Sequence, residues 1–182
     1  MSAELCLGIL AGGEGRRFGG VDKGWLTLQG QSLIERLLQR VCPTGPILIS
    51  ANRHLDQYRA LGHSVLPDAD PGQGPMGGVQ TLWQACTQRY LCLLPVDAVD
   101  WPENGIERLL QALQCSEAAL AVARVGADWH YPCVMLDRQR LRGVPPSRGS
   151  LRAWIQSEDS VAVDFPVGSR FSLNTPAELA AA

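Results

Sequence analysis

The chain has 182 residues, of which 46% are hydrophobic and 19% are charged, as in an ordinary folded globular protein. Its formal net charge of −2 gives no overall attraction to nucleic acid or to an anionic membrane, so any anion site must be local. No apolar run reaches the ~18 residues that a membrane span needs, and the start lacks the pattern of a signal peptide. We therefore expect a single domain over residues 1–182, located in the cytoplasm.

The cysteines support the same location. None of them shows C-x-x-C spacing, and no cluster of Cys and His has the spacing of a zinc site. Because several lie in apolar runs, we expect reduced, buried thiols. The six are Cys6, Cys42, Cys86, Cys92, Cys115 and Cys133.

Short apolar runs alternate with helical patterns, which is typical of a mostly parallel sheet covered by helices on both faces. The predicted strands are Leu5–Leu10, Pro46–Ser50, Ser64–Leu66, Tyr90–Leu94 and Ala118–Val125. The predicted helices are Ser32–Val41, Leu55–Leu61, Gly78–Gln88 and Ile106–Gln114. Such sheets bind ligands at the carboxyl ends of their strands.

The second half of the chain is less regular. The run "HYPCVML" predicts a strand, which we expect to be a short antiparallel edge of the sheet. "SLRAWIQ" predicts a short helix that Ser150 opens. "NTPAELAAA" predicts a last helix, with Asn174 or Thr175 as its cap and Pro176 at its first position.

A glycine-rich loop, "LAGGEGRRFGGVDKG", follows the first predicted strand. Glycines let backbone N–H groups approach a ligand closely, and successive N–H groups can form a concave site for an anion. Arg16, Arg17 and Lys23 add positive charge that suits a polyphosphate. Lys23 is the only lysine beside 15 arginines, which favours a specific role for its small ammonium group over a plain surface turn.

Two standard nucleotide motifs do not fit this loop. Lys23 follows Asp22 and precedes Gly24, so the P-loop pattern G-x-x-x-x-G-K-[ST] is absent. The dinucleotide pattern G-x-G-x-x-G lacks its third glycine, because Phe18 stands in that place. The second mismatch counts against an NAD-dependent dehydrogenase.

The loop resembles L-A-G-G-x-x-x-R-x-G-x-x-K, the signature of nucleotidyltransferases that move NMP from an NTP onto a phosphate or phosphosugar. Together with "SANRH", the chain looks most like the MobA-like molybdenum cofactor guanylyltransferases. The resemblance implies a Rossmann-like nucleotidyltransferase fold, with an N-terminal part that binds the nucleotide and a C-terminal part that binds the acceptor. It also implies transfer of GMP from GTP to Mo-molybdopterin, with Mg²⁺, giving molybdopterin guanine dinucleotide and pyrophosphate.

The resemblance assigns roles in the nucleotide half. The backbone of Leu10, Ala11, Gly12 and Gly13 holds the nucleotide, while Arg17 and Lys23 neutralise the triphosphate and the departing pyrophosphate. Arg16 remains open, because a solvent-facing side chain explains it equally well. Catalysis then consists of positioning and charge neutralisation.

Acidic residues follow two of the predicted strands. Asp97, after Tyr90–Leu94, matches the carboxylate that binds Mg²⁺ in the family, and a hard oxygen ligand suits that ion. Asp100 is the rival ligand, although "DWP" is also typical of a turn or cap. Asp68, in "LPDAD", matches an acidic residue of the nucleotide site; an Asx turn is the alternative, and Asp70 is the weaker candidate.

Two further segments match less completely. In "SANRH", Asn52 and Arg53 match the family, and we expect Asn52 at the nucleotide; Ser50 stands where the family has Asn. "GPMGG" fits a loop that closes over the base and ribose and then opens a helix, or a plain turn.

The far half is expected to bind the acceptor. His130 and Pro132 match a His-Pro element near the pterin, and Arg148 and Arg152 suit its phosphate; a structural histidine and solvated arginines are the alternatives. Asn174 lies near the metal in related enzymes, although capping alone would explain it.

Other functions stay open from the sequence. A sister nucleotidyltransferase would use CTP with a pterin, or an NTP with a sugar phosphate, and "GPMGG" does not decide the base. A non-catalytic nucleotide-binding partner is a second alternative, against which Lys23 and Asp97 count. The resemblance further implies two kinds of partner protein: proteins that deliver the cofactor, and molybdoenzymes that receive it.

Overall fold

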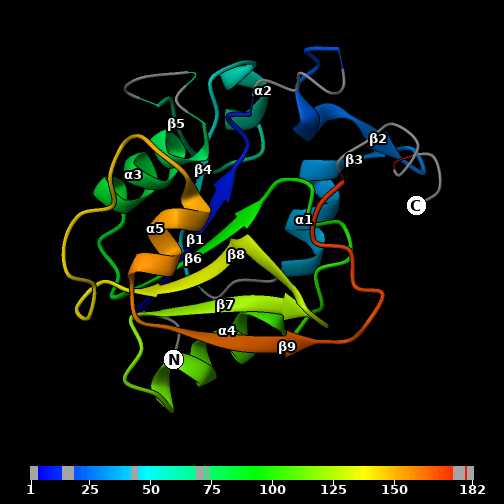
Figure 1. Ribbon diagram of the computed structural model, residues 1–182. Helices are drawn as coiled ribbons and strands as arrows, with labels where there is room; N and C mark the ends of the chain where they lie inside the picture. Colours follow the sequence, from blue (N-terminus) through cyan, green and yellow to red (C-terminus); the bar gives the residue numbers. More distant parts are fainter. Residues whose placement is uncertain are drawn as a thin grey trace.

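A seven-stranded sheet lies at the centre of the structure, a computed structural model that describes residues 4–13, 19–41, 45–68, 72, 74–173 and 179 (Figure 1). Across the sheet the strands are β5 (Ser64–Leu66), β4 (Ile47–Ser50), β1 (Leu5–Leu10), β6 (Tyr90–Pro95), β8 (Asp128–Asp137), β7 (Leu120–Val125) and β9 (Ser160–Phe165). Strand β8 is antiparallel to both of its neighbours, and the other four pairings are parallel. The predicted mostly parallel α/β sheet is therefore confirmed.

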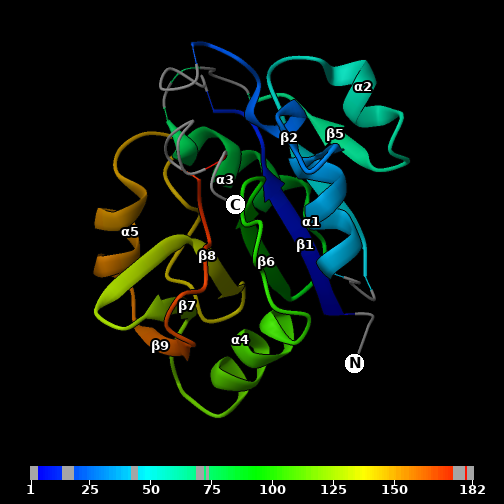
Figure 2. The ribbon, with the colours of Figure 1, turned by 90° about the vertical axis from the view of Figure 1, so that its right-hand side faces the viewer.

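Helices cover both faces of this sheet. They are α1 (Leu33–Val41), α2 (Leu55–Arg59), α3 (Pro75–Ala85), α4 (Gly105–Gln114) and α5 (Leu151–Ser157). Buried side chains of α1 and α4 pack on one face, and those of α3 and α5 pack on the other. Figure 2 shows α1 and α5 on opposite sides of the strands. A 3-10 turn, η3 (Lys23–Trp25), and a small antiparallel pair, β2 (Thr27–Leu28) and β3 (Gln31–Ser32), lie between β1 and α1.

Local signals explain where several helices begin. The N–H of Ser32 donates to Glu35 Oε2 at 3.2 Å and the N–H of Glu35 donates to Ser32 Oγ at 3.4 Å, a capping box at the start of α1. Ser150 caps α5 as predicted, because its side chain accepts a hydrogen bond from the N–H of Ala153. Helix α3 begins at Pro75, three residues before the predicted start, since proline is favoured at a first helical position.

The prediction that "HYPCVML" forms a short antiparallel edge was only half right. Strand β8 is antiparallel, but it is ten residues long and lies between β6 and β7. Pro132 has no N–H for a sheet ladder, which favoured the edge position. The pairing of β7 with β8 passes from Val134 directly to His130, so Pro132 falls in an irregularity that avoids the missing bond. The true edges are β5 and β9, and β9 was not predicted.

The described cysteines are free thiols, and the expected burial holds for Cys6, Cys86, Cys92 and Cys133, whereas Cys115, which follows the last residue of α4, is exposed. Within the described part of the chain, every helix is too short or too polar to cross a lipid bilayer. The predicted last helix, from Asn174 onward, lies outside the described residues.

Asp137, a buried carboxylate at the end of β8, lies next to the start of β6, at the opposite end of the sheet from the site described below. Arg89 donates from its Nη2 to Asp137 Oδ2 at 2.9 Å, and the N–H of Gln139 donates to Oδ1 at 3.0 Å. Burial would raise the pKa of Asp137, but these bonds and the charges of Arg89 and Arg140 hold it below its ordinary value. The ionised form therefore stabilises the fold.

We expect Asp137→Asn to lower the free energy of unfolding at pH 7 by about 2–3 kcal/mol, because two arginines lose a buried partner. Urea denaturation of both proteins measures this. Since the pKa is depressed in the folded state, the stabilisation is complete above about pH 4 and is lost as the pH falls through the folded pKa. Equal stability of the two proteins at pH 7 would contradict the assignment.

Candidate active site

Four of the predicted site residues come together at the carboxyl ends of parallel strands, at the top of Figure 1. Gly12 follows β1, Asn52 follows β4, Asp68 follows β5 and Asp97 follows β6. These strands are neighbours in the order β5-β4-β1-β6, so the residues after them form one cluster. The position is where open α/β sheets bind their ligands.

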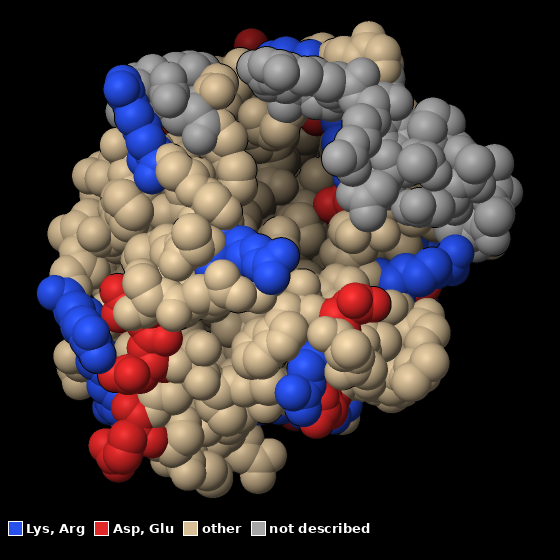
Figure 3. All heavy atoms as spheres, in the orientation of Figure 1, with Lys and Arg blue, Asp and Glu red and all other residues tan. Residues whose placement is uncertain are grey.

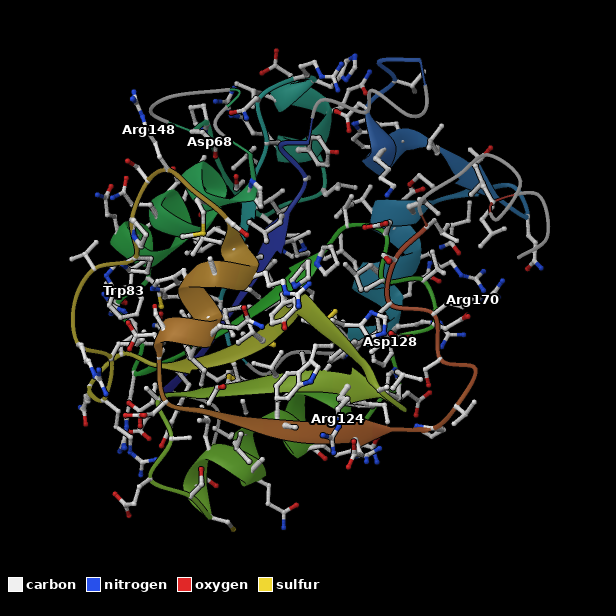
Figure 4. The ribbon with its side chains drawn as sticks, viewed as in Figure 1. Asp68, Trp83, Arg124, Asp128, Arg148 and Arg170 are labelled. Atoms are coloured by element: carbon white, nitrogen blue, oxygen red, sulfur yellow. The ribbon has the colours of Figure 1, made fainter. Side chains whose placement is uncertain are left out.

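Asp68 is the centre of a hydrogen-bonded network. Its Oδ1 accepts from Ser50 Oγ at 2.7 Å, and its Oδ2 accepts from Asn52 Nδ2 at 2.9 Å. The N–H of Asp68 in turn donates to Asn52 Oδ1 at 2.9 Å. Asp68 is 8% exposed, and in Figure 4 it lies near the upper end of β5. Ser50, which departs from the family pattern, thus supplies a hydrogen bond that fixes this carboxylate.

The backbone of Gly12 lies against the same network. Asn52 Nδ2 donates to the Gly12 carbonyl at 3.3 Å. A Cβ atom on Gly12 would lie 2.9 Å from Asn52 Nδ2 and 3.3 Å from Asp68 Oδ2, which is too close without movement. An alanine here would therefore have to displace the Asn52 amide from its place beside Asp68. Gly78, in the first turns of α3, is packed as tightly, since its Cβ would lie 2.7 Å from Ser50 Oγ.

Lys23 and Asp97 are in direct contact across the cluster. The Nζ of Lys23 lies 2.5 Å from Asp97 Oδ2, although 74 residues separate them in the chain. The N–H of Leu173 also donates to this oxygen, at 2.7 Å. The Asp97 side chain is 6% exposed and that of Lys23 is 23% exposed. The contact places one cation and one oriented anion side by side at the end of β6.

Asp100, the rival to Asp97, has a different environment. Arg170 Nε donates to Asp100 Oδ2 at 2.6 Å, and the N–H of Asp100 donates to the Arg170 carbonyl at 3.2 Å. Arg170 lies at the right of Figure 4, on the segment that follows β9. This geometry gives Asp100 the role of fixing that segment, whose residue Leu173 orients Asp97.

The side expected to bind the acceptor lies along the first half of β8. The His130 ring contacts Phe171 edge-on at 5.2 Å, and burial lowers the pKa of His130 while Asp128 partly offsets the effect. The exposed guanidinium of Arg152 lies 5.7 Å from the Tyr131 ring. Arg148 is exposed and extends outward at the upper left of Figure 4. Figure 3 shows a hollow above the middle of the sheet, on the same view of the molecule.

Several predicted residues cannot be placed. Arg16, Arg17, Asp70 and Asn174 lie outside the described residues. The loop prediction for "GPMGG" needs correction: Pro75, Met76, Gly77 and Gly78 form the first turn of α3, and only Gly74 precedes the helix.

The sequence analysis missed three residues beside Lys23. Asp22 is 3% exposed, and it bonds to Tyr58 and His54. A buried acid next to the only lysine was a usable signal, but its partners lie 32 and 36 residues away in the chain.

The comparisons with known proteins agree with this geometry. Residues 7–161 match the model of the MobA-like NTP transferase domain. The chain belongs to the MobA-like NTP transferase family. It is therefore a nucleotidyltransferase, and the prediction of a Rossmann-like nucleotidyltransferase fold is confirmed.

Two relatives illustrate the similarity within this family. A molybdenum cofactor guanylyltransferase of Shewanella loihica is 35% identical over 167 residues, which cover 91% of this chain and 81% of that protein. Another, of Shewanella sp. strain ANA-3, is 40% identical over 144 residues, covering 78% and 73%. These relatives confirm the resemblance stated from the sequence motifs.

A solved structure supports the fold. The molybdopterin-guanine dinucleotide biosynthesis protein A of Archaeoglobus fulgidus superposes with a TM-score of 0.73, covering 97% of this chain and 95% of that chain. Its sequence is 17% identical, so this likeness concerns the fold alone.

Proposed function

We propose that this nucleotidyltransferase transfers GMP from GTP to the phosphate of Mo-molybdopterin, forming molybdopterin guanine dinucleotide and pyrophosphate. The names of its relatives support this reaction. The observation that carries the proposal is the contact of Lys23 with Asp97 at the carboxyl end of β6, the strand that pairs with β1. A triphosphate needs a nearby positive charge, which Lys23 supplies, and its divalent ion needs a nearby carboxylate, which Asp97 supplies.

The nucleotide is proposed to lie on the backbone of Leu10, Ala11, Gly12 and Gly13. Asn52 and Asp68, fixed to each other by two hydrogen bonds, face the same place and suit the polar edges of the base and ribose. Lys23, with Arg17, neutralises the triphosphate. The ammonium group of a lysine is a compact positive charge, which suits close contact with phosphate oxygens.

Asp97 fits a magnesium ion. Mg²⁺ usually binds one or two carboxylates and completes its ligand set with water and substrate phosphates. The described residues contain no group of three or more His, Cys, Asp or Glu side chains that could hold a metal, so a site with one carboxylate suits Mg²⁺ better than a structural metal. Bound Mg²⁺ supplies electrostatic stabilisation of the phosphates during transfer. The Leu173 N–H and Lys23 hold the Asp97 carboxylate in one orientation.

The proposed reaction is an in-line displacement at the α-phosphorus of GTP. An oxygen of the acceptor phosphate forms the new P–O bond, and the bond to the pyrophosphate oxygen breaks. The acceptor phosphate is already an anion, so no side chain need act as the nucleophile. Lys23 and Arg17 stabilise the charge that grows on the leaving pyrophosphate, which lowers the barrier more than it strengthens GTP binding.

The acceptor is proposed to bind beside the first half of β8, where Arg152 lies over Tyr131 and suits its phosphate and where His130 is paired with Ala123 of β7. Arg148, on the segment before α5, is the other arginine proposed for that phosphate. The protein partners proposed for this enzyme are proteins that deliver the molybdenum cofactor and molybdoenzymes that receive the product. The proposed location is the cytoplasm. These assignments rest on the motifs and on the exposure of the two arginines.

Direct product analysis tests the proposal. The protein is incubated with Mg²⁺, molybdenum cofactor and, in separate reactions, GTP, CTP, ATP or UTP, and dinucleotide products are identified by mass spectrometry. The proposal predicts the guanine dinucleotide in the GTP reaction. Product from CTP alone, or transfer only to a sugar phosphate, would instead support a sister nucleotidyltransferase.

The close approach at Gly12 gives a further prediction. We expect Gly12→Ala to raise the KM for GTP by about 10-fold, since the new methyl group displaces Asn52 from Asp68. Steady-state kinetics at varied GTP measure the change. Gly143→Ala is the matched control, because Gly143 lies outside the proposed site and a Cβ there would have no described atom within 4 Å. An unchanged KM for the Gly12 variant would show that Asn52 and Asp68 do not shape the nucleotide site.

A further inference from the structure

Three consecutive residues between β4 and α2 bond to three different parts of the region around the site. Asn52 bonds to Gly12 and Asp68, as described above. Arg53 Nη2 donates to the Gly13 carbonyl at 3.1 Å, and its Nη1 donates to the Gly20 carbonyl at 2.5 Å. One guanidinium group therefore joins the two described ends of the glycine-rich segment. The planar fork of an arginine is suited to holding two acceptors at once.

His54 contacts the residue before the catalytic lysine. Its Nδ1 lies 3.1 Å from Asp22 Oδ2. The other carboxylate oxygen of Asp22 accepts from the Tyr58 hydroxyl at 2.8 Å and from the Gly24 N–H at 3.1 Å. Asp22 is thus the N-terminal cap of η3, the turn that presents Lys23. Because the carboxylate is buried, its hydrogen bonds define the position of the turn.

The side chain of Tyr58 packs against this turn. It is fully buried, and its ring packs against Trp25 with ring centres 5.0 Å apart. A Cβ atom on Gly24 would overlap the Tyr58 hydroxyl, so the turn and the phenol are in tight contact. Burial and the neighbouring Asp22 raise the pKa of Tyr58 well above its ordinary value, which keeps the hydroxyl a neutral donor. Residues on both sides of Lys23 are therefore bonded to, or packed on, one side chain of α2.

We propose that Arg53 and Tyr58 are positioning residues for transfer: Arg53 sets the shape of the glycine-rich segment, and Tyr58 sets the place of Lys23 through Asp22. The inference rests on the proposed function, in which that segment holds GTP and Lys23 acts on its phosphates. Neither side chain belongs to the proposed contacts with substrate. They act on different steps, because the segment binds GTP throughout the reaction whereas Lys23 meets charge that grows during transfer.

Kinetics separate the two roles. Tyr58→Phe removes only the hydroxyl, and we expect kcat to fall by about 10-fold with little change in the KM for GTP, because a small displacement of a catalytic group is costly. Arg53→Gln cannot bridge both carbonyls, and we expect the KM to rise by about 10-fold. Arg59→Gln is the control, since Arg59 is an exposed residue of the same helix that pairs with Asp56 within α2.

The single lysine gives a readout that does not need activity. Protein produced with ¹³C-labelled lysine has one lysine side chain to observe by NMR. In the unaltered protein we expect two distinct signals for the Lys23 ε-protons, as for an immobilised side chain. In Tyr58→Phe these signals should merge or shift, while in Arg59→Gln they should stay unchanged.

The outcomes are distinguishable. Unchanged kcat and unchanged Lys23 signals in Tyr58→Phe, with only a lower melting temperature, would show that Tyr58 is merely structural. A KM in Arg53→Gln equal to that of the unaltered protein would overturn the role of Arg53. If the unaltered protein forms no dinucleotide, the proposed function fails, and the Lys23 signals still decide whether Tyr58 positions the lysine.

Discussion

Replacement of Lys23 by alanine is expected to lower kcat/KM for GTP by about 10²–10³-fold, with far-UV circular dichroism unchanged. The reason is that the ammonium group lies beside Asp97 and, in the proposed reaction, is a fixed positive charge next to the pyrophosphate as it leaves. Such a charge stabilises the transition state without needing to move. The Lys23 side chain is partly exposed, so we expect only a small change in stability. Initial rates of dinucleotide formation and thermal unfolding curves measure the two effects.

Lys23→Arg is the informative companion to the alanine variant. Arginine keeps the charge but replaces a compact group with a larger planar one, so we expect partial recovery of activity over alanine. Full activity of the alanine variant would mean that the charge at position 23 plays no part in transfer.

The second large effect is expected for Asp97→Asn, which should reduce activity by about 10³-fold and remove its dependence on Mg²⁺ concentration. The amide is nearly the same size as the carboxylate and can still accept from the Leu173 N–H, so the local structure is kept. What is lost is the charge that pairs with Lys23 and that we propose holds the divalent ion. Rates at several Mg²⁺ concentrations separate a lost metal ligand from a general loss of activity.

Asp100→Asn tests the rival ligand, since it alters a carboxylate three residues away whose bond to Arg170 fixes the segment that carries Leu173. We expect a partial loss of activity with the normal Mg²⁺ dependence, because Asp97 keeps its charge. If Asp100→Asn lost activity and Asp97→Asn kept it, the assignment of the metal ligand would be reversed.

Much of the fold was predictable because its signals are local. Leu5–Leu10 and Ser64–Leu66 have the predicted bounds. Leu5–Leu10 is almost wholly buried, and a buried parallel strand appears as a continuous apolar run between turn residues. The start of α5 followed from its serine cap, while α1 begins at Leu33, one residue after the start predicted from its apolar spacing. Positions after strands β1, β4, β5 and β6 then place Gly12, Asn52, Asp68 and Asp97 at one edge by topology alone.

What the sequence could not provide is pairing between distant segments. The interior place of β8 depends on its partners β6 and β7, and a proline within it argues locally for an edge. The hydrogen bond of Tyr58 to Asp22, and the two bonds of Arg53 to Gly13 and Gly20, likewise join residues far apart in the chain. The spacing of apolar residues along the chain does not predict such contacts.

The most direct test of the central claim is a crystal structure with a non-hydrolysable GTP analogue and Mn²⁺ in place of Mg²⁺. The account predicts the triphosphate against the backbone of Gly12 and Gly13, with a phosphate oxygen near Lys23 Nζ and the anomalous peak of the manganese ion beside Asp97. A triphosphate bound away from Lys23, or an ion coordinated without Asp97, would contradict it.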